Sequence, residues 1–497
     1  MQTALPSTLW HVLLAQSQQR GNAPALRFEG RETTYAQLTE QSRAIAASLL
    51  SQGIQRGDRI PWLGLNHPLQ IALLFACAGI GAIAMPLNYR LAAPELERIL
   101  RDGKPSLLVH DAACAEMAKG LSANCTLPLH SFQSLLGDGL NLPAANMQQG
   151  QADDAALLVY TSGTTGLPRG AVHTQHNLYQ NMLIVGINTA LSATDLVASM
   201  LPLFHVGGLC IQTLPALMAG ACVSLHARFD ASAALRCFAE ERPTLTLQVP
   251  ATMRALIDHP DWASTDLSSL RAVWAGSSVL PANLIEAFHA RGIPVCNVYG
   301  STETGPFSIS LPPEHARSHV GSCGWPARDD VQVKLVDAQQ GVGEICIRAP
   351  NVAMSYWPDL PLKDEQGWFH TGDLARQDAD GSYWVVGRAK DMLISGGENI
   401  YPFEIENLLA AQPGVIECAV VGMPDAKWGE VVAACIVLAP EANQAQMQEQ
   451  LSEALSSQLA RYKLPRQWYF LPALPKTALG KVQKSQLLVQ LVAQPRS

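Results

Sequence analysis

The stretch from Leu157 to Asn177, LLVYTSGTTGLPRGAVHTQHN, constrains the fold of this chain more than any other part. It begins with Leu157 to Tyr160, a short apolar run that is typical of a strand buried on both faces. A loop rich in hydroxyl groups and glycine follows at once, and a helix-forming segment comes after it. We therefore expect a buried strand, a loop and a helix in succession.

The composition of this loop suits a polyphosphate. Its glycines permit positive φ angles, so that unhindered backbone N–H groups can converge on an anion together with the hydroxyl groups. Arg169 could add a fixed positive fork for phosphate oxygens. The GK[ST] ending of a Walker A loop is missing, which excludes the kinase and GTPase interpretation. A flexible Ser/Gly linker is the alternative, but a linker would not normally separate a buried strand from a helix.

The chain resembles the acyl-adenylating enzymes, a family of acyl-CoA synthetases, aryl-CoA ligases, luciferases and adenylation domains of peptide synthetases. The resemblance covers nearly the whole chain and rests on six motifs that are weak singly and specific in this order. One departure is Arg169, where the family more often has lysine, and the charge is retained. The motifs are TSGTTGLPRG, YGSTETG (Tyr299 to Gly305), HTGD (His370 to Asp373), GRAKD (Gly387 to Asp391), SGGENIYP (Ser395 to Pro402) and PKTALGK (Pro475 to Lys481).

The length, composition and net charge of the chain limit the classes of protein to which it can belong. A chain of 497 residues exceeds what one core usually serves, so we expect two or more domains. A composition of 48% hydrophobic and 15% charged residues is typical of a globular enzyme with large cores. The net charge of -8 argues against a nucleic-acid surface. Anionic substrates must therefore be held by local positive charges.

Cysteine usage and hydropathy indicate a cytoplasmic protein. The 11 cysteines include no CxxC pair, which favours neither a disulfide framework nor a zinc site. The N-terminal segment lacks the pattern of a signal peptide. The run from Ile71 to Leu87 is uncharged but short of a membrane span, so we expect a buried helix followed by a strand and no integral membrane segment. A homodimer is left open.

From Asp58 onward, apolar runs that predict strands, such as Val295 to Tyr299, alternate with helical patterns, such as Ala282 to Ala290, which predicts an α/β domain with a mostly parallel sheet. Ligands bind such sheets at the carboxyl ends of the strands. Three loops that follow strands directly, Thr161 to Gly166, Gly276 to Ser278 and Gly300 to Gly305, are expected to meet there. Before this domain, residues from Trp10 to about Leu50 predict two helices and a hairpin that form a cap.

The C-terminal part of the chain has a different pattern. Val331 to Arg348 predicts short strands of alternating pattern and hence a β-rich subdomain before HTGD. Past Gly387, two helices and two strands predict a small α+β unit. We place the boundary at Gly387 to Asp391, which divides the chain into a large domain, residues 1–387, and a small mobile domain, residues 388–497.

The resemblance implies a nucleotide site. Thr302 would donate its hydroxyl to the α-phosphate, and Glu303 would be a magnesium ligand rather than a solvated loop acid. Asp373 would accept hydrogen bonds from the ribose hydroxyls, a role compatible with an Asx-turn, and Arg388 would hold the ribose side. The other residues implied for ATP or AMP binding are Thr161, Ser162, Gly163, Thr164, Thr165, Gly166, Arg169, Ser277, Tyr299, Gly300 and Lys481.

The resemblance also implies the catalytic residues and the acyl pocket. Lys481 would bridge the substrate carboxylate and the α-phosphate, where charge develops in the transition state. His205, in PLFHVGG, would lie where the acyl pocket meets the carboxylate site; a packed histidine beside Phe204 is the alternative. Trp274, which could equally be plain core, would line this pocket together with Gly276, Pro306 and Phe307.

A change of domain orientation would serve the second half-reaction. Lys390 occupies the hinge position, where altered backbone dihedrals would rotate the small domain; by sequence alone it is an exposed charge. Gly396 and Gly397 would let the pantetheine arm of CoA pass close to the backbone.

These residues predict an AMP-forming acid:CoA ligase that uses ATP, Mg²⁺ and CoA. The acid is expected to be aromatic, such as a phenylpropenoate, or a medium- or long-chain fatty acid. Alternatives are loading of a carrier-protein thiol, a dicarboxylate or succinylbenzoate ligase, a luciferase-type oxygenase and a catalytically dead regulator. The aspartate that usually holds an amino-acid substrate is missing from PLFHVGGL, and a dead regulator would be expected to have lost Glu303 or Lys481.

Overall fold

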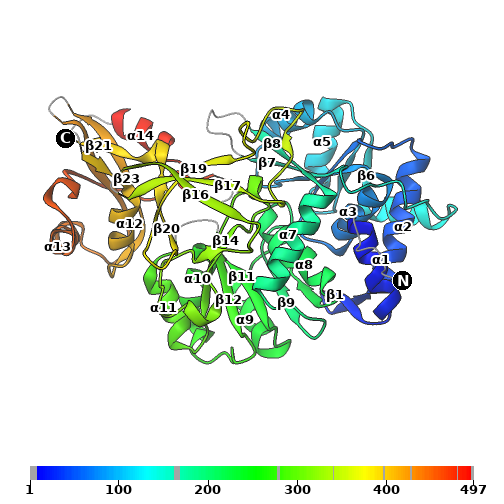
Figure 1. The fold of residues 1–497 in the computed structure, drawn as a ribbon, viewed down its shortest axis with the longest axis horizontal. Helices are drawn as coiled ribbons and strands as arrows, with labels where there is room; N and C mark the ends of the chain where they lie inside the picture. Colours follow the sequence, from blue (N-terminus) through cyan, green and yellow to red (C-terminus); the bar gives the residue numbers. More distant parts are fainter. Residues whose placement is uncertain are drawn as a thin grey trace.

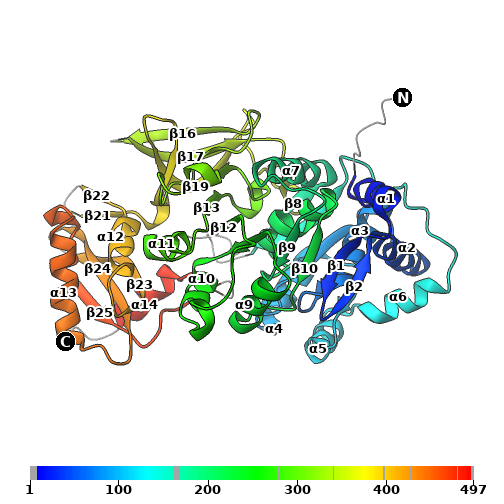
Figure 2. The same ribbon diagram turned by 90° about the horizontal axis from the view of Figure 1, so that it is seen from below.

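The computed structural model describes residues 8–161, 168–276, 280–339, 341–395, 398–425, 428–477 and 480–493. Figure 1 shows a large body that contains most of the chain and a smaller lobe that contains the C-terminal strands and helices. In the view turned by 90°, the small lobe again lies at one end of the long axis (Figure 2).

One large sheet has nine strands and is parallel through its middle. Its edge strands pair antiparallel, as does the hairpin near Phe28. This hairpin joins the sheet, because its first strand pairs in parallel with β10. In spatial order the strands are β15 (Trp325–Pro326), β14 (Ile309–Ser310), β13 (Val295–Tyr299), β12 (Ala272–Gly276), β11 (Leu245–Gln248), β9 (Leu196–Ser199), β10 (Cys222–Leu225), β1 (Pro24–Phe28) and β2 (Arg31–Thr34).

A second sheet contains the strand before the glycine-rich loop. It is parallel from β7 to β6 and antiparallel at its other edge. In spatial order its strands are β18 (Ser355–Tyr356), β8 (Arg169–Thr174), β7 (Ala155–Thr161), β4 (Ile83–Leu87), β3 (Arg59–Leu63), β5 (Leu108–His110) and β6 (Leu129–Ser131).

The loop after β7 leads into a strand, and the expectation of a helix directly after it was wrong. Residues from Arg169 to Thr174 form β8, which pairs antiparallel with β7, and α7 begins only at Gln175. The apolar and β-branched residues of GAVHT are buried in this pairing, so ladder hydrogen bonds outweigh the helical pattern here. β7 and β8 therefore form an antiparallel pair.

The largest hydrophobic core contains residues from both sheets, among them Trp62, Leu157 and Val223. As expected, the uncharged run from Ile71 to Leu87 forms a buried helix, α3, followed by the strand β4. In the part of the chain that the structure describes, no helix is long and apolar enough to cross a membrane. The helices of the large body are α1 (Leu9–Arg20), α2 (Tyr35–Ser51), α3 (Pro68–Ile80), α4 (Ala93–Gly103), α5 (Ala115–Cys125), α6 (Phe132–Leu140), α7 (Gln175–Asn188), η1 (Gly207–Thr213), α8 (Leu214–Met218), α9 (Ala231–Glu240), α10 (Pro250–Ile257), η2 (Pro260–Trp262), α11 (Ala282–Ala290), η3 (Thr302–Thr304) and η4 (Pro313–His315).

A third, four-stranded sheet is antiparallel throughout and forms the predicted β-rich subdomain. The HTGD motif lies within its third strand rather than after the sheet. Its strands are β16 (Gln332–Gln339), β17 (Val342–Arg348), β19 (Phe369–Gln377) and β20 (Tyr383–Arg388).

The small lobe is the predicted α+β unit and has its own hydrophobic clusters. Arg388 still pairs with Asp373 of β19, and the short helix η5 (Ala389–Asp391) leads from there to β21. The domain boundary at 387–391 stays a prediction. The remaining elements are β21 (Leu393–Ser395), β22 (Glu398–Ile400), α12 (Pro402–Ala410), β23 (Val415–Asp425), β24 (Gly429–Leu438), α13 (Gln444–Ser456), η6 (Arg461–Lys463), β25 (Gln467–Phe470) and α14 (Lys484–Ala493).

Candidate active site

Asp373 lies at the centre of the predicted nucleotide site and is held from two sides. The hydroxyl of Tyr299, the last residue of β13, donates to Asp373 Oδ2 at 2.9 Å. Arg388 Nε lies 2.8 Å from Asp373 Oδ1. Burial raises the pKa of Asp373, and the Arg388 guanidinium opposes this shift. Each carboxylate oxygen has a second lone pair, so the oriented group can still accept hydrogen bonds from two hydroxyls.

Thr302 and Glu303 stand in η3, directly after β13, and their backbone is tied to neighbouring elements. His173 Nε2 lies 2.8 Å from the carbonyl oxygen of Thr302, and the Ala353 N–H donates to the carbonyl of Glu303 at 2.8 Å. The hydroxyl of Tyr356 donates to Glu303 Oε1 at 3.0 Å. The backbone of the turn that carries both side chains is thus held by hydrogen bonds to His173 and Ala353. A half-buried carboxylate of this kind fits Mg²⁺, which prefers oxygen ligands.

His173 and Tyr356 were missed by the sequence interpretation. Burial lowers the pKa of His173 to about 4, so the imidazole that supports Thr302 is neutral at physiological pH. The Arg169 guanidinium lies 5.7 Å from the centroid of the Tyr356 ring, which links Arg169 to Glu303 through this tyrosine. The flanking letters AVHT and MSYW resemble no catalytic pattern, so only strand pairing reveals these roles.

Lys481 reaches this group from the small lobe. Lys481 lies close enough to Asp373 and Glu303 for their negative charges to favour its protonated form, whereas the positive charge of Arg388 disfavours that form. Burial is the larger effect and lowers the pKa of Lys481. By its accessible surface, however, Lys481 is exposed. The lowered pKa and the exposure of Lys481 are compatible, because protein atoms around part of a side chain lower the pKa of a lysine even when another part is open to water.

His205 also lies within range of the charge of Lys481. Burial, and next the charge of Lys481, lower the pKa of His205 to about 4. The Gly207 N–H donates to His205 Nδ1 at 3.1 Å, so the neutral ring carries its proton on Nε2. An uncharged donor thus stands beside the lysine, which is the arrangement expected where a substrate carboxylate meets its acyl pocket.

Two predicted glycines are required by close backbone contacts. A Cβ on Gly300 would lie 1.8 Å from the carbonyl oxygen of Pro306, and a Cβ on Gly276 would lie 2.5 Å from that of Val298. Phe307 follows Pro306, and both are buried. The absence of a side chain at Gly276 and Gly300 therefore lets the loops at the ends of β12 and β13 pack against neighbouring backbone.

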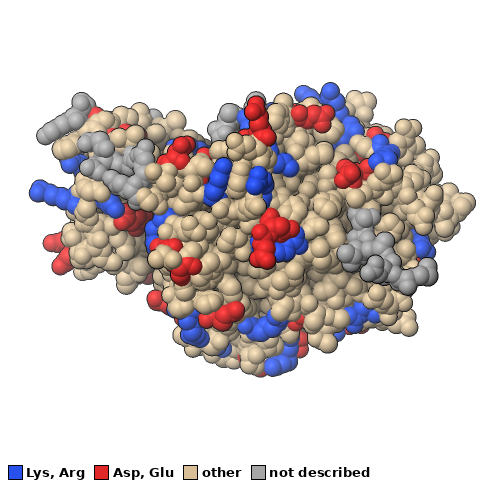
Figure 3. Space-filling view, in the orientation of Figure 1, with Lys and Arg blue, Asp and Glu red and all other residues tan. Residues whose placement is uncertain are grey.

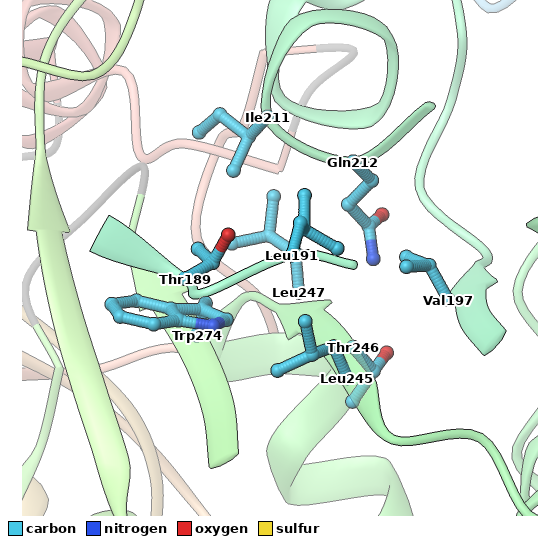
Figure 4. A pocket seen from close by; sticks show the side chains of 9 residues that line it. All are labelled: Thr189, Leu191, Val197, Ile211, Gln212, Leu245, Thr246, Leu247 and Trp274. Carbon is cyan, nitrogen blue, oxygen red and sulfur yellow. The ribbon is translucent and has the colours of Figure 1, made fainter. Parts of the chain in front are cut away.

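A small cavity of about 20 Å³ lies behind this region (Figure 4). Trp274, a predicted pocket residue, contributes to it, and its ring centroid lies 6.2 Å from that of Phe307. All nine side chains that line the cavity are uncharged. They are Thr189, Leu191, Val197, Ile211, Gln212, Leu245, Thr246, Leu247 and Trp274.

The other predicted residues lie at the edge of the site or outside the described residues. The Thr161 hydroxyl donates to the Arg169 carbonyl at 3.3 Å, and the Arg169 side chain is exposed. Lys390 lies exposed in η5, two residues after Arg388. Ser162, Gly163, Thr164, Thr165, Gly166, Ser277, Gly396 and Gly397 fall outside the described residues.

Comparison with known sequences decides the family. The family model for the AMP-binding enzyme matches residues 13–357, and that for the C-terminal domain of AMP-binding enzymes matches residues 404–481. The chain belongs to the AMP-binding enzyme family. It is an AMP-forming acid–thiol ligase, as the named CoA ligases among its relatives are.

Relatives of this AMP-binding enzyme match it over almost their full length. The indoleacetate–CoA ligase of Aromatoleum aromaticum is 43% identical over 490 residues, covering 94% of this chain and 95% of the relative. The feruloyl-CoA synthase of an Amycolatopsis species is 39% identical over 478 residues, with coverage of 94% and 95%. The crystal structure of an anthranilate CoA ligase in complex with anthranoyl-AMP superposes with a TM-score of 0.90 at 29% identity, covering 99% of each chain.

The surface of this AMP-binding enzyme shows why its anionic substrates need local charges. Acidic and basic side chains are interspersed over the face in Figure 3, in keeping with the net charge of -8. Arg169, Arg388 and Lys481 bring positive charge close to Glu303 and Asp373. Such a group can bind phosphate oxygens while its acids bind a metal ion and ribose hydroxyls.

Proposed function

We propose that this enzyme activates an aromatic carboxylic acid whose tail is uncharged with ATP and transfers the resulting acyl group to CoA. The observation that carries the proposal is that the charges of Asp373 and Glu303 act on Lys481, and that the charge of Lys481 acts on His205, a residue predicted to line the acyl pocket. Trp274 and Phe307, which are both predicted to line the acyl pocket, have ring centroids 6.2 Å apart, and such aromatic surface favours an aromatic tail. Relatives named for indoleacetate and ferulate support the same substrate class.

In the first half-reaction, a carboxylate oxygen of the acid attacks the α-phosphorus of ATP and pyrophosphate leaves. The barrier lies in bringing two anions together, so positioning and positive charge are the main means of catalysis. Lys481 would stabilise the charge shared by the carboxylate and the α-phosphate, and the Thr302 hydroxyl would donate to that phosphate. Bound Mg²⁺ would supply further positive charge at the phosphates, held by Glu303.

In the second half-reaction, the CoA sulfur attacks the acyl carbonyl of the acyl-AMP, and AMP leaves as the thioester forms. Lys481 has no role in this step, because the leaving group is already activated. We propose that rotation at Lys390 withdraws Lys481 and brings the segment around Gly396 and Gly397 to the acyl-AMP. The two reactions then use one site in turn.

The test measures pyrophosphate release with ATP, Mg²⁺ and a panel of acids, with and without CoA. The panel contains indoleacetate, ferulate, 4-coumarate, benzoate, hexanoate, palmitate, malonate and succinylbenzoate. We expect the aromatic monocarboxylates to give the highest kcat/KM. A preference for palmitate, malonate or succinylbenzoate would overturn the substrate class, and no release with any acid would overturn the function.

Lys481→Ala tests whether Lys481 serves adenylation but not thioester formation. The variant should lose adenylation by at least a hundredfold yet still convert supplied acyl-AMP and CoA to the thioester. Lys119→Ala, which removes an exposed lysine paired with Glu116 on α5, is the matched control. A carrier-protein thiol offered in place of CoA tests the alternative acceptor, and turnover with it alone would replace CoA in the proposal.

A further inference from the structure

A cysteine, a histidine and two carboxylates gather on the antiparallel sheet of the β-rich subdomain. Alternate side chains of a strand share one face, so Glu344 and Cys346 of β17 lie on the same face. His370 of β19 lies directly opposite Cys346 in the antiparallel register. Ligand atoms of these three residues lie within 4.8 Å of one another. Since they come from two strands and include no CxxC pair, spacing in the sequence does not reveal this group.

His370 is held in a fixed orientation by Asp364. Nε2 of His370 lies 3.3 Å from Asp364 Oδ2, so this nitrogen donates its proton to the carboxylate. The other oxygen, Asp364 Oδ1, accepts from the backbone N–H groups of Trp368 at 2.8 Å and Gln366 at 2.9 Å. In proteins, histidines that bind metals commonly donate their second ring N–H to such a carboxylate. The Nδ1 atom of His370 is therefore directed at the remaining groups.

His370 Nδ1 makes two contacts of the length expected between atoms that share a metal ion. It lies 3.2 Å from Glu344 Oε2 and 3.3 Å from Cys346 Sγ. Nitrogen, oxygen and sulfur atoms bind a tetrahedral Zn²⁺ at about 2.0 to 2.3 Å, which places any two of them about 3.3 to 3.6 Å apart. One proton on Nδ1 can serve only one of the two contacts well, whereas an ion can bind all three atoms.

The charge and the exposure of this group also suit a cation. Glu344 and Asp364 are carboxylates, and a metal that binds Cys346 displaces the thiol proton and adds a further negative charge. Lys334, opposite Cys346 on β16, has its ammonium 4.2 Å from the centroid of the Trp368 ring, which holds this positive charge over the aromatic face. The side chains of His370 and Glu344 are 47% and 24% exposed, so the group opens to solvent above the buried cysteine.

We propose that Glu344, Cys346 and His370 bind a divalent transition-metal ion such as Zn²⁺. Glu344 Oε2, Cys346 Sγ and His370 Nδ1 supply three ligands, and the fourth position of the tetrahedron faces solvent. Sulfur and nitrogen ligands favour such an ion over Mg²⁺, which the proposed function assigns to Glu303. The inference goes beyond the proposed function and concerns a second, separate ion.

A bound ion would stabilise the strand that carries the predicted ribose acceptor. Glu344 Oε1 accepts from the Gly372 N–H at 2.8 Å, and Asp373 is the next residue. Coordination of Glu344 and His370 would therefore hold β17 against the HTGD segment of β19. Because the unfolded chain does not keep these ligands together, the ion should raise the stability of the folded enzyme.

A second group of similar composition provides a matched control. Ligand atoms of His226, Cys237 and Glu241 also lie within 4.8 Å of one another. Nε2 of His226 lies 3.5 Å from the hydroxyl of Ser224, a longer contact than the one that Asp364 makes with His370. We therefore expect the metal to bind at Cys346 and not at Cys237.

The experiment titrates the chelator-treated full chain with Co²⁺, a spectroscopic probe of Zn²⁺ sites, in the presence of excess Mg²⁺. We expect the wild type to bind one Co²⁺ with the near-ultraviolet absorption of a cobalt–thiolate bond, and Zn²⁺ should abolish this absorption. Cys346→Ser should lose the absorption, and Cys237→Ser should keep it. Asp364→Asn should keep the absorption but weaken Co²⁺ binding about tenfold, because the histidine loses its orienting carboxylate.

Thermal unfolding gives a second readout. Zn²⁺ should raise the Tm of the wild type and of Cys237→Ser, but not that of Cys346→Ser. If Cys346→Ser does not fold, His370→Gln, which changes an exposed side chain, must weaken Co²⁺ binding at least about tenfold. A wild type without the absorption, or absorption that Cys346→Ser retains, would overturn the inference. Neither result bears on the proposed function, which the release of pyrophosphate decides.

Discussion

Arg388, the last residue of β20, lies directly opposite Asp373 of β19, and its Nε contacts Asp373 Oδ1 at 2.8 Å. The pair joins the predicted ribose acceptor to a residue of the predicted hinge, Gly387 to Asp391. Rotation at 389–391 would therefore begin next to the bound nucleotide. Tyr299 holds the other oxygen of the carboxylate, so the aspartate itself is anchored to the large body.

Asp373→Asn should weaken the binding of ATP without lowering the stability of the folded enzyme. Burial raises the pKa of Asp373 above its unfolded value of 3.8, so the ionised carboxylate lowers the stability of the folded enzyme as the pH rises through the folded pKa. At pH 7 the variant should therefore unfold at the same temperature as the wild type or at a higher one. Its KM for ATP should rise about tenfold, because hydrogen bonds to a charged acceptor are lost. Thermal unfolding and initial rates check both, and a clear fall in Tm would contradict the first.

Tyr356→Phe tests the support of the proposed magnesium ligand. The change removes the hydrogen bond to Glu303 Oε1, worth about 1 kcal/mol, and leaves the ring that Arg169 contacts. The Mg²⁺ concentration for half-maximal adenylation should rise about fivefold. Tyr469→Phe removes a comparable hydroxyl contact, to Gln467 in the small lobe, and should have no such effect. An unchanged Mg²⁺ dependence in Tyr356→Phe would contradict the proposal that Glu303 is a magnesium ligand.

Lys390→Pro should impair the second half-reaction selectively. Lys390 lies in the 3-10 helix η5, whose φ angles are close to the value that proline imposes, so proline fits this conformation and resists leaving it. Adenylation should stay within about twofold of the wild type, while thioester formation from supplied acyl-AMP should fall at least tenfold. Lys390→Ala, which removes the charge but not the backbone freedom, should preserve both. Equal losses in the two half-reactions would argue against a hinge at this residue.

Gly300→Ala should destabilise the enzyme. Its Cβ would lie 1.8 Å from the Pro306 carbonyl oxygen, so the backbone of one loop would have to move, at a cost of about 3 kcal/mol. Denaturant unfolding should show this loss. Gly120→Ala is the control, because a Cβ there meets nothing within 4 Å and alanine favours the helix α5. Equal stability of the two variants would show that the Gly300 loop adapts.

Local patterns in the sequence predicted much of the fold. The helix expected over Ala282 to Ala290 and the strand expected over Val295 to Tyr299 match α11 and β13. Hydrophobic periodicity reports these elements because it depends on neighbours within a few residues. The same periodicity could not show that residues 169–174 form a strand, since their conformation depends on pairing with β7.

The sequence by itself determined the family, the reaction class and the secondary structure of most segments, because motifs and periodicity are local properties of the chain. Only the tertiary structure decided which distant side chains meet. Tyr356 contacts Glu303 across 53 residues, and Tyr299 contacts Asp373 across 74. The lining that joins Gln212 to Trp274 likewise combines η1, β11 and β12. Such contacts follow from the order of strands in the sheets and the packing between them, which no short segment encodes.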